Sequence, residues 1–252
     1  MEDEKMMGDV YAVYLRELIR LWRQKVRLVT TIVMPLLWLG VIGNAFNNAF
    51  KMPFKGDFLS FLTPGILVMT MVFTSTISGI TTVFDREFGF LKEMLVAPIK
   101  RESILIGKML GGVTQAILQG VIIIILAIIM GVNFKGVAAI PGMLLTMFLV
   151  SIAFVSFGLA VASKMTSMEG FQMVMNFLIQ PMIFLSGAFY PTKMLPSWLK
   201  IGVKLNPLTY GVDAMRYFAI GINEFNVVID LMVMIVLSIV FILLGGYLFR
   251  KS

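Results

Sequence analysis

The sequence contains no cysteine and no histidine, and only 14% of its 252 residues are charged. Without cysteine there is no disulfide framework, and without histidine there is no Cys/His zinc site and no Ser-His-Asp or Cys-His nucleophile. Soluble domains carry about 25% charged residues, so this chain has too few polar groups to cover a globular surface. With 59% apolar residues it does not fit the composition of a disordered chain either. These absences leave an integral membrane protein.

Long apolar runs are the dominant feature of what is present. A helix needs roughly 20 apolar residues to cross a bilayer. Runs without Asp, Glu, Lys or Arg that approach or exceed this length lie at 28–50, 58–84, 109–134, 136–163, 170–192 and 231–249. The segment 121–130 does not alternate polar with apolar residues as a barrel strand does. The chain is therefore predicted to be one all-α integral membrane domain over 1–252, with six transmembrane helices at about 28–48, 59–84, 109–131, 137–163, 171–190 and 227–249.

Lysine and arginine set the expected orientation. With the N-terminus in the cytoplasm, inner segments hold 14 of the 21 basic residues and outer segments hold 7. The positive-inside rule then predicts a multi-pass protein of the cell (plasma or inner) membrane with both termini cytoplasmic. The net charge of +7 is expected to face anionic lipid, and no nucleic-acid partner is expected. The first run is too long for a cleavable signal peptide and is expected to be retained.

Two cytoplasmic segments carry helical patterns. Residues 9–27 combine basic side chains with Trp22, which predicts a helix lying at the membrane surface; a charged topogenic flank is the alternative. Residues 85–100 predict an amphipathic helix, because Phe88, Leu91 and Leu95 share one face and Pro98 ends or bends the element. Such a helix either lies in the headgroups or inserts into a groove of a partner protein. Its acidic residues disfavour the negatively charged inner leaflet.

The segment before the last span predicts two short helices over 191–222 at the outer leaflet, with an ordinary surface hairpin as the alternative. Asn206-Pro207 supplies an N-cap and a first-position proline for the second helix. Asp213 and Arg216 are spaced to pair on it. Trp198 and several tyrosines suit a membrane interface.

No acid or base falls in the middle of a predicted span, which disfavours a proton relay or a voltage sensor. Neutral polar side chains do form stripes in three spans. Either they line a translocation pathway or they make hydrogen bonds between helices. The candidate pathway residues are Thr70, Thr74, Ser78, Gln115, Gln119, Gln172, Asn176 and Gln180.

The chain lacks a phosphate-binding G-x-x-x-x-G-K-[ST] loop, a metal-ligand cluster and a plausible carboxylate pair. We therefore expect that it is not an enzyme and holds no cofactor or metal.

The order of these parts resembles a known family. It is similar to the permeases of type-2 ATP-binding-cassette (ABC) exporters, which include daunorubicin-type drug exporters and polysaccharide exporters. The basic helix before the first span, Arg86-Glu87-Phe88-Gly89 with Glu93, Leu95 and Pro98, and the segment from Asn206-Pro207 to Arg216 carry the resemblance over nearly the whole chain. It implies a half-transporter that pairs with a second copy or a sister permease in the lipid bilayer. Two copies of a separate ABC ATPase would hold ATP and Mg.

The resemblance also implies roles for particular residues. The set expected to contact the ATPase is Arg86, Glu87, Phe88, Gly89, Leu91, Glu93, Leu95, Pro98, Met168 and Glu169. The set expected at an outer gate formed by a re-entrant helix pair is Trp198, Asn206, Pro207, Tyr210, Asp213 and Arg216.

The expected function is outward movement of amphipathic, hydrophobic or lipid-linked cargo by alternating access, powered by the partner ATPase. Two alternatives stay open at this stage. One is a secondary transporter driven by an ion gradient, and the other is a scaffold that recruits a cytoplasmic partner without transporting anything. A membrane enzyme is disfavoured by the absence of histidine. The sequence alone leaves open the cargo, import against export, and homodimer against heterodimer.

Overall fold

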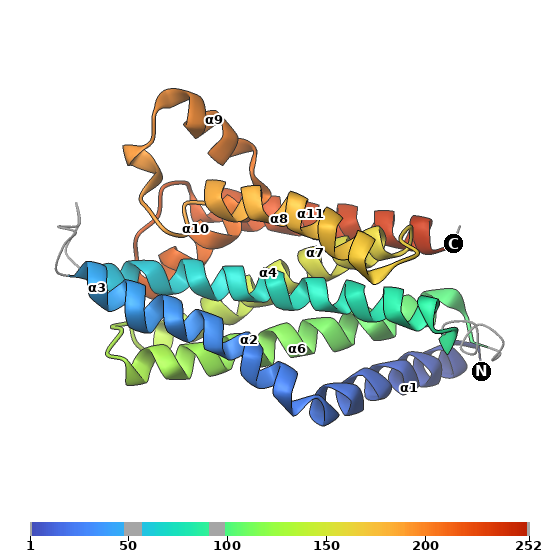
Figure 1. The fold of residues 1–252 in the computed structure, drawn as a ribbon. Coiled ribbons are helices and arrows are strands. Elements are labelled where there is room, and N and C mark those ends of the chain that lie inside the picture. Colours follow the sequence, from blue (N-terminus) through green and yellow to red (C-terminus); the bar gives the residue numbers. More distant parts are fainter. Residues whose placement is uncertain (1, 48–56, 91–98, 251–252) are drawn as a thin grey trace.

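The computed structural model describes residues 2–47, 57–90 and 99–250, and these residues form helices and connecting loops with no strand (Figure 1). The helices are α1 (Glu2–Arg23), α2 (Lys25–Leu37), α3 (Asn44–Asn47), α4 (Phe58–Glu87), α6 (Arg101–Ile129), α7 (Ile140–Ala162), α8 (Met168–Leu185), α9 (Ser197–Leu205), α10 (Pro207–Ile220) and α11 (Val227–Arg250). A π-helical turn, Trp38–Gly43, joins α2 to α3, and short 3-10 turns occur at Val137–Ala139 and Thr192–Met194.

The long helices run side by side in one bundle (Figure 1). Both termini lie at the same end, which we call the terminal end, together with the α7–α8 connection. The opposite, distal end holds α3 and α10, and α9 projects from the bundle there. An even number of crossings would produce this placement of the termini.

Within the described residues, four helical segments are long and apolar enough to cross a membrane, namely α4, α6, Val137–Ala162 and Val227–Phe249. They correspond to four of the six predicted spans and support a membrane-embedded protein. The first predicted span is interrupted, because Pro35 lies inside α2 and the π-helical turn follows it; π-helical insertions of this kind often mark functional sites. The fifth, α8, is an 18-residue helix with three amide side chains. The count of six therefore stays a prediction at these two positions.

Helix α4 lies at the centre of the protein. Every residue from 58 to 72 is buried, and the main core joins Leu67 and Met71 of α4 to Met147 and Phe154 of α7 and Met215 of α10. Burial on all sides explains why residues 58–72 include no charged side chain.

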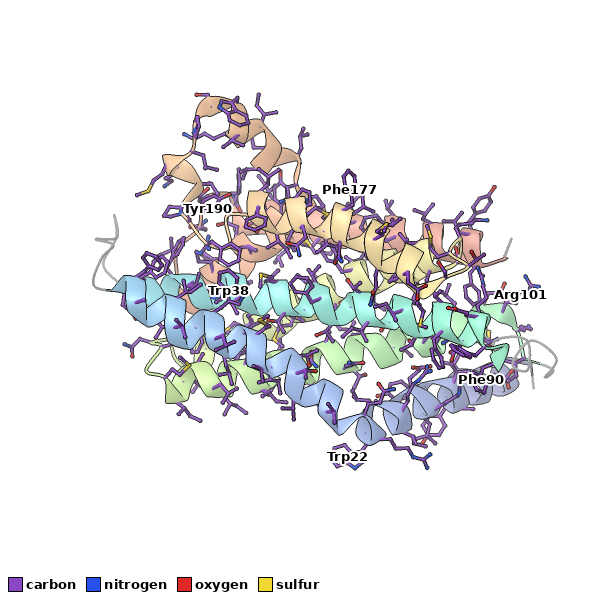
Figure 2. All side chains as sticks on the ribbon, in the orientation of Figure 1. Trp22, Trp38, Phe90, Arg101, Phe177 and Tyr190 are labelled. Carbon is purple, nitrogen blue, oxygen red and sulfur yellow. The ribbon has the colours of Figure 1, made fainter. Side chains whose placement is uncertain are left out.

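Helix α1 begins at Glu2 and breaks at Gln24, so the helix expected over 9–27 begins earlier and divides. One side of α1 packs on α6, where Val13 is buried with Ile104 and Phe249. The opposite side exposes large apolar residues, and Trp22 points away from the bundle (Figure 2). Its location at a membrane surface stays a prediction.

Close backbone contact fixes the loop after α8 against α4. A Cβ atom on Gly65 would lie 2.7 Å from the Ala188 Cα and 2.8 Å from its carbonyl carbon, which are backbone atoms that cannot rotate away. Only glycine allows the loop to sit this close to α4.

We expect Gly65→Ala to destabilise the protein by about 1–3 kcal/mol, the range for overpacking a core. The measurement is the thermal unfolding midpoint in detergent. Gly8→Ala is the matched control, because nothing lies within 4 Å of a Cβ at that position of α1. An equal, small effect of the two changes would contradict the close packing at Gly65.

Candidate functional sites

At the terminal end, the last turn of α4 is hydrogen-bonded to the connection between α7 and α8. The Arg86 Nη1 donates hydrogen bonds to the carbonyl oxygens of Ser163 (2.7 Å) and Met165 (3.2 Å). The Glu87 carboxylate accepts one from the backbone N–H of Met168 at 3.3 Å. The structure therefore brings together three members of the predicted ATPase-contact set, Arg86 and Glu87 at the end of α4 and Met168 at the start of α8.

The other described members of that set lie near the same end of the protein but are not joined by these hydrogen bonds. Phe88 ends α4 and is exposed, Gly89 follows with a φ of 81° that favours glycine, and Glu169 is exposed in the first turn of α8. Phe88 and Phe90 both pack against Phe84, with ring centroids 4.4 and 6.3 Å from it. Leu91, Glu93, Leu95 and Pro98 lie outside the described residues.

The expected helix over 85–100 does not begin at Asp85, because α4 continues through Glu87. This extension buries a charged group that the sequence pattern assigned to a loop. The Asp85 carboxylate is fully buried, and its Oδ2 lies 2.5 Å from the Lys108 Nζ and 3.4 Å from the Arg16 Nη1. Its Oδ1 lies 3.3 Å from the Arg20 Nη1.

We call Asp85, Lys108, Arg16, Arg20 and Glu17 the Asp85 cluster. Glu17 completes it, since its carboxylate lies 3.5 Å from the Lys108 Nζ. The cluster joins α1, α4 and α6 by charge. Lys108 is 2% exposed, so neither member of the central pair reaches solvent.

The sequence reasoning missed this cluster because it ended each span at the first charged residue. Asp85 directly follows the uncharged run 58–84, and Lys108 directly precedes the uncharged run 109–134. A helix that continues past the end of such a run buries the charged residue next to it. Arg16 and Arg20 of α1 were the signal in the sequence that could have indicated this cluster, because they are possible partners for a buried carboxylate.

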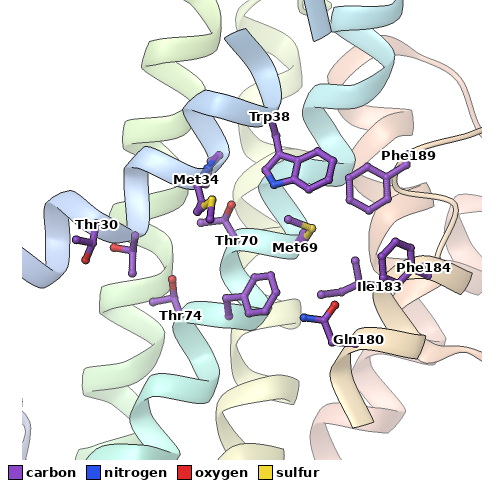
Figure 3. Close-up of a pocket in the computed structure, with 13 residues that line it drawn as sticks. Thr30, Met34, Trp38, Met69, Thr70, Thr74, Gln180, Ile183, Phe184 and Phe189 are labelled. Atoms are coloured by element: carbon purple, nitrogen blue, oxygen red, sulfur yellow. The ribbon is translucent and has the colours of Figure 1, made fainter. Parts of the chain in front are cut away.

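A cavity of about 370 Å³ opens between α2, α4 and α8 (Figure 3). Its wall is mostly apolar, and Trp38 and Phe189 meet across one side with ring centroids 4.9 Å apart. The polar side chains in the wall are Thr30, Thr31, Thr70, Thr74 and Gln180. Such a surface suits a molecule with a large apolar part and few hydrogen-bonding groups.

The predicted pathway residues divide among different environments. Thr70, Thr74 and Gln180 line this cavity. Gln119 is buried. It accepts a hydrogen bond from the Thr74 hydroxyl and donates one to the Thr31 hydroxyl at 2.5 Å. It therefore stabilises two residues of the cavity wall without lining the cavity itself.

The remaining four pathway residues do not line the cavity. Ser78 and Gln115 line a smaller recess beside the Asp85 cluster. Gln172 and Asn176 are exposed on α8. Phe177, on the same helix, points away from the bundle (Figure 2).

At the distal end, the predicted gate residues hold loops in place. Asn206 caps α10 by accepting from the Leu208 N–H at 3.1 Å, and it donates to the Met182 carbonyl at 2.6 Å. Pro207 occupies the first turn, as its sequence predicted. Tyr210 donates to the Lys204 carbonyl at 2.7 Å, and Trp198 on α9 is exposed.

Asp213 and Arg216 are both buried in α10 but bond to backbone rather than to each other. The Asp213 carboxylate accepts from the N–H groups of Glu224 (2.9 Å) and Phe225 (2.8 Å). The Arg216 Nη2 donates to the Gly187 carbonyl at 2.9 Å, and its guanidinium lies 4.0 Å from the centroid of the Phe61 ring. Burial raises the pKa of the Glu224 carboxyl in this region above its ordinary value.

Comparison with known proteins now identifies the family. A model of the ABC-2 type transporter family matches residues 9–220, which run from α1 to the end of α10. The chain belongs to the ABC-2 type transporter family. This membership confirms the resemblance read from the sequence.

Several ABC-2 relatives extend over most of the chain. It is 31% identical to a putative transport permease, ycf38, of Cyanophora paradoxa, over 96% of this chain and 88% of that protein. It is 25% identical to the inner membrane transport permease YadH of Escherichia coli K12, over 98% of this chain and 95% of that protein. It is also 25% identical to the probable doxorubicin resistance ABC transporter permease protein DrrC of Mycobacterium tuberculosis, over 82% and 75%.

ABC-2 membership makes the chain a membrane permease of an ABC transporter, and it implies a partner subunit that binds ATP. The family match covers the Asp85 cluster, the cavity and α10, while α11 follows it. The terminal-end contacts, the Asp85 cluster, the cavity and the predicted gate residues therefore all lie in the part of the chain that matches the family model.

The Asp85 cluster gives a prediction about this permease. Removing one partner of a buried ion pair costs roughly 3–5 kcal/mol, whereas replacing both by apolar or neutral groups is often far less costly. We therefore expect Asp85→Asn alone and Lys108→Met alone to lower the thermal unfolding midpoint in detergent, and the double variant to recover part of the loss.

Glu169→Gln is the control for that cycle, since it removes a carboxylate that is exposed. Strictly additive losses in the double variant would show that Asp85 and Lys108 do not stabilise the protein as a pair.

Proposed function

We propose that this permease is the membrane half of an ATP-driven exporter for amphipathic, hydrophobic or lipid-linked cargo. The single observation that carries the proposal is the connected terminal end, where Arg86 and Glu87 tie α4 to the α7–α8 loop. In the proposed orientation this end and both termini are cytoplasmic. Two copies of a separate ATPase, holding ATP and Mg, bind there, and the permease chain itself holds no cofactor.

The contacts around α4 suit this end for transmitting force. A displacement of the loop after α4 acts directly on Arg86 and Glu87, and through them on the start of α8. The next residue inward, Asp85, connects the same turn to α1 and α6. Because buried ion pairs resist separation, these helices are expected to move as one body. Exposed Phe88 and Phe90 supply an apolar contact for the ATPase.

The cavity between α2, α4 and α8 is the proposed cargo site. Its apolar wall with a few hydroxyl and amide groups suits amphipathic molecules better than ions. Each of the three helices has an internal proline, namely Pro35, Pro64 and Pro181. A proline removes a helix hydrogen bond and allows bending, so α2 and α8, which are less buried than α4, can bend to open or close the cavity.

A second permease copy, or a sister permease, is proposed to cover the outer faces of α2 and α8. Met173 and Phe177 are 75% and 79% exposed, and they flank the exposed amides of Gln172 and Asn176. Amides facing lipid lose their hydrogen bonds, which is costly. A partner helix would satisfy these groups and would also close the open side of the cavity.

One observation favours the ion-driven alternative. Asp230 is fully buried in the first turn of α11, beside Asp213, and buried acids in membrane helices often carry protons or ions. That reading requires cargo movement in the absence of any ATPase, and it requires Asp230→Asn to abolish that movement. The scaffold alternative requires partner binding without any flux.

The coupling proposal is tested by co-expressing the permease with a candidate ABC ATPase. We expect the two to co-purify, and we expect Glu87→Lys combined with Phe88→Ala to weaken binding about tenfold or more, which corresponds to at least 1.4 kcal/mol. Trp198→Ala at the distal end is the control and should leave binding unchanged. A wild-type permease that is folded but binds no such ATPase would refute the half-transporter proposal.

The cargo site is tested by filling the cavity from its edge. Met34 lines the cavity and is 62% exposed, so Met34→Trp adds bulk without entering the core. We expect it to lower cargo-stimulated ATP hydrolysis in the assembled transporter about tenfold, or 1.4 kcal/mol. Val33→Trp is the matched control, because Val33 adjoins it on α2 but does not line the cavity. Equal effects of the two changes would place the cargo elsewhere.

A further inference from the structure

A second cavity of about 370 Å³ lies at the distal end and has a different character from the first. It is bounded by α4, by the loop between α8 and α9, by α10 and by the loop between α10 and α11. The lining residues that matter here are Phe61, Lys193, Met194, Arg216, Asn223 and Glu224. Two of them are cations and one is an acid, so the cavity combines an excess of positive charge with an apolar wall.

Arg216 is the unusual member of this wall. Its side chain is held by the Gly187 carbonyl and by the Phe61 ring, and the residue is only 3% exposed. Its Nε is buried and has no hydrogen-bond partner among the described residues. Leaving a buried donor of a charged group unsatisfied costs free energy, so a donor without a partner in the protein is a place where water or a ligand binds.

The nearby carboxylates do not serve as that partner. Asp213 and Glu224 lie close enough to influence Arg216 electrostatically. However, Asp213 accepts hydrogen bonds from two backbone N–H groups of the following loop, and the Glu224 Oε1 accepts one from the Thr192 N–H at 3.0 Å. The two carboxylates therefore bond to the loop between α8 and α9 and to the loop between α10 and α11. The Arg216 guanidinium is held in place but still has an N–H group that can donate a hydrogen bond.

The surroundings indicate what would use that capacity. A guanidinium with a second cation nearby is the arrangement that binds phosphate oxygens well. Helix α9, which begins three residues after Met194, exposes Trp198, Ile201 and Leu205 and also carries Lys200 and Lys204. Exposed aromatic and aliphatic side chains mixed with lysine are typical of a membrane interface.

We propose that this distal cavity binds the phosphate group of an anionic phospholipid, with Arg216 and Lys193 on the phosphate oxygens and Phe61 and Met194 against the apolar part of the lipid. This site is independent of the cargo cavity, and its occupation needs no ATPase. Free phosphate offers the same oxygens without the apolar part, and the experiment separates the two sources.

The test uses the purified full-length chain in a neutral detergent, with dioctanoyl phosphatidylglycerol as the probe and native mass spectrometry to count bound lipid. We expect one tightly bound lipid. Dioctanoylglycerol, which lacks the phosphate, should bind at least about tenfold more weakly, because it loses the charge-assisted hydrogen bonds. Inorganic phosphate at millimolar concentration should compete only weakly.

The variants are chosen so that binding changes in both directions. Glu224→Gln removes the one negative charge from the wall and keeps an acceptor for the Thr192 N–H, so it should tighten binding of the lipid about threefold or more. Lys193→Glu should weaken binding about tenfold. Lys200→Glu is the matched control: it makes the same change on α9, outside the cavity, and should leave the affinity unchanged.

Other outcomes overturn the proposal. If the phosphate-free lipid binds as well as phosphatidylglycerol, the cavity recognises apolar chains and not phosphate. If inorganic phosphate binds and the lipid does not, the assignment to a lipid is wrong. If Lys193→Glu and Lys200→Glu weaken binding equally, the lipid lies on the general basic surface of α9 and not in the cavity.

Discussion

The buried carboxylate of Asp85 is the constraint on which the arrangement at the terminal end depends. A charge at a fully buried position must be matched by opposite charge, and here Lys108, Arg16 and Arg20 converge on it. The requirement fixes α1 and α6 against α4, because moving any one of them would leave a charge without its partner. It also explains why α1, which carries many charged side chains, packs against the bundle along one face.

Helix α4 connects the three sites. Its last turn carries Arg86 and Glu87, which are hydrogen-bonded to the residues between α7 and α8. Its middle contributes Thr70 and Thr74 to the proposed cargo cavity, and its first turn contributes Phe61 to the distal cavity. These sites lie on one 30-residue helix that is buried along most of its length. Under the proposed function, a shift of α4 would change all three together, and this would link ATP binding at the terminal end to release of cargo at the distal end.

The parts of the chain that surround the cargo cavity contrast with the charge-locked end. Pro35 and the π-helical turn after it interrupt α2, and Pro181 interrupts α8. Fewer continuous helix hydrogen bonds and an exposed, partly polar face make these two helices easier to move than α6 or α7. In the proposed mechanism the helices joined by ion pairs move as one unit and the wall of the cavity is displaced, which are the two requirements of alternating access.

Hydrophobic run length determined much of the fold from the sequence, because four spans need little more than enough apolar residues to cross a bilayer. Local chemistry determined the start of α10 as well, since asparagine at the N-cap and proline at the first helical position favour the start of a helix. The motif around Arg86 and Glu87 likewise indicated the family. What the sequence did not reveal were pairings between distant residues. Because the predicted spans ended at Asp85 and Lys108, the sequence did not show that these two residues are buried as a pair. Their positions along the predicted spans also did not distinguish Gln119, which is hydrogen-bonded behind the cavity wall, from Gln180, which lines the cavity. Only the packing of the helices decides such pairings and environments. A residue's charge or polarity is set by its own chemistry, whereas its burial and its partner are set by segments far away in the chain.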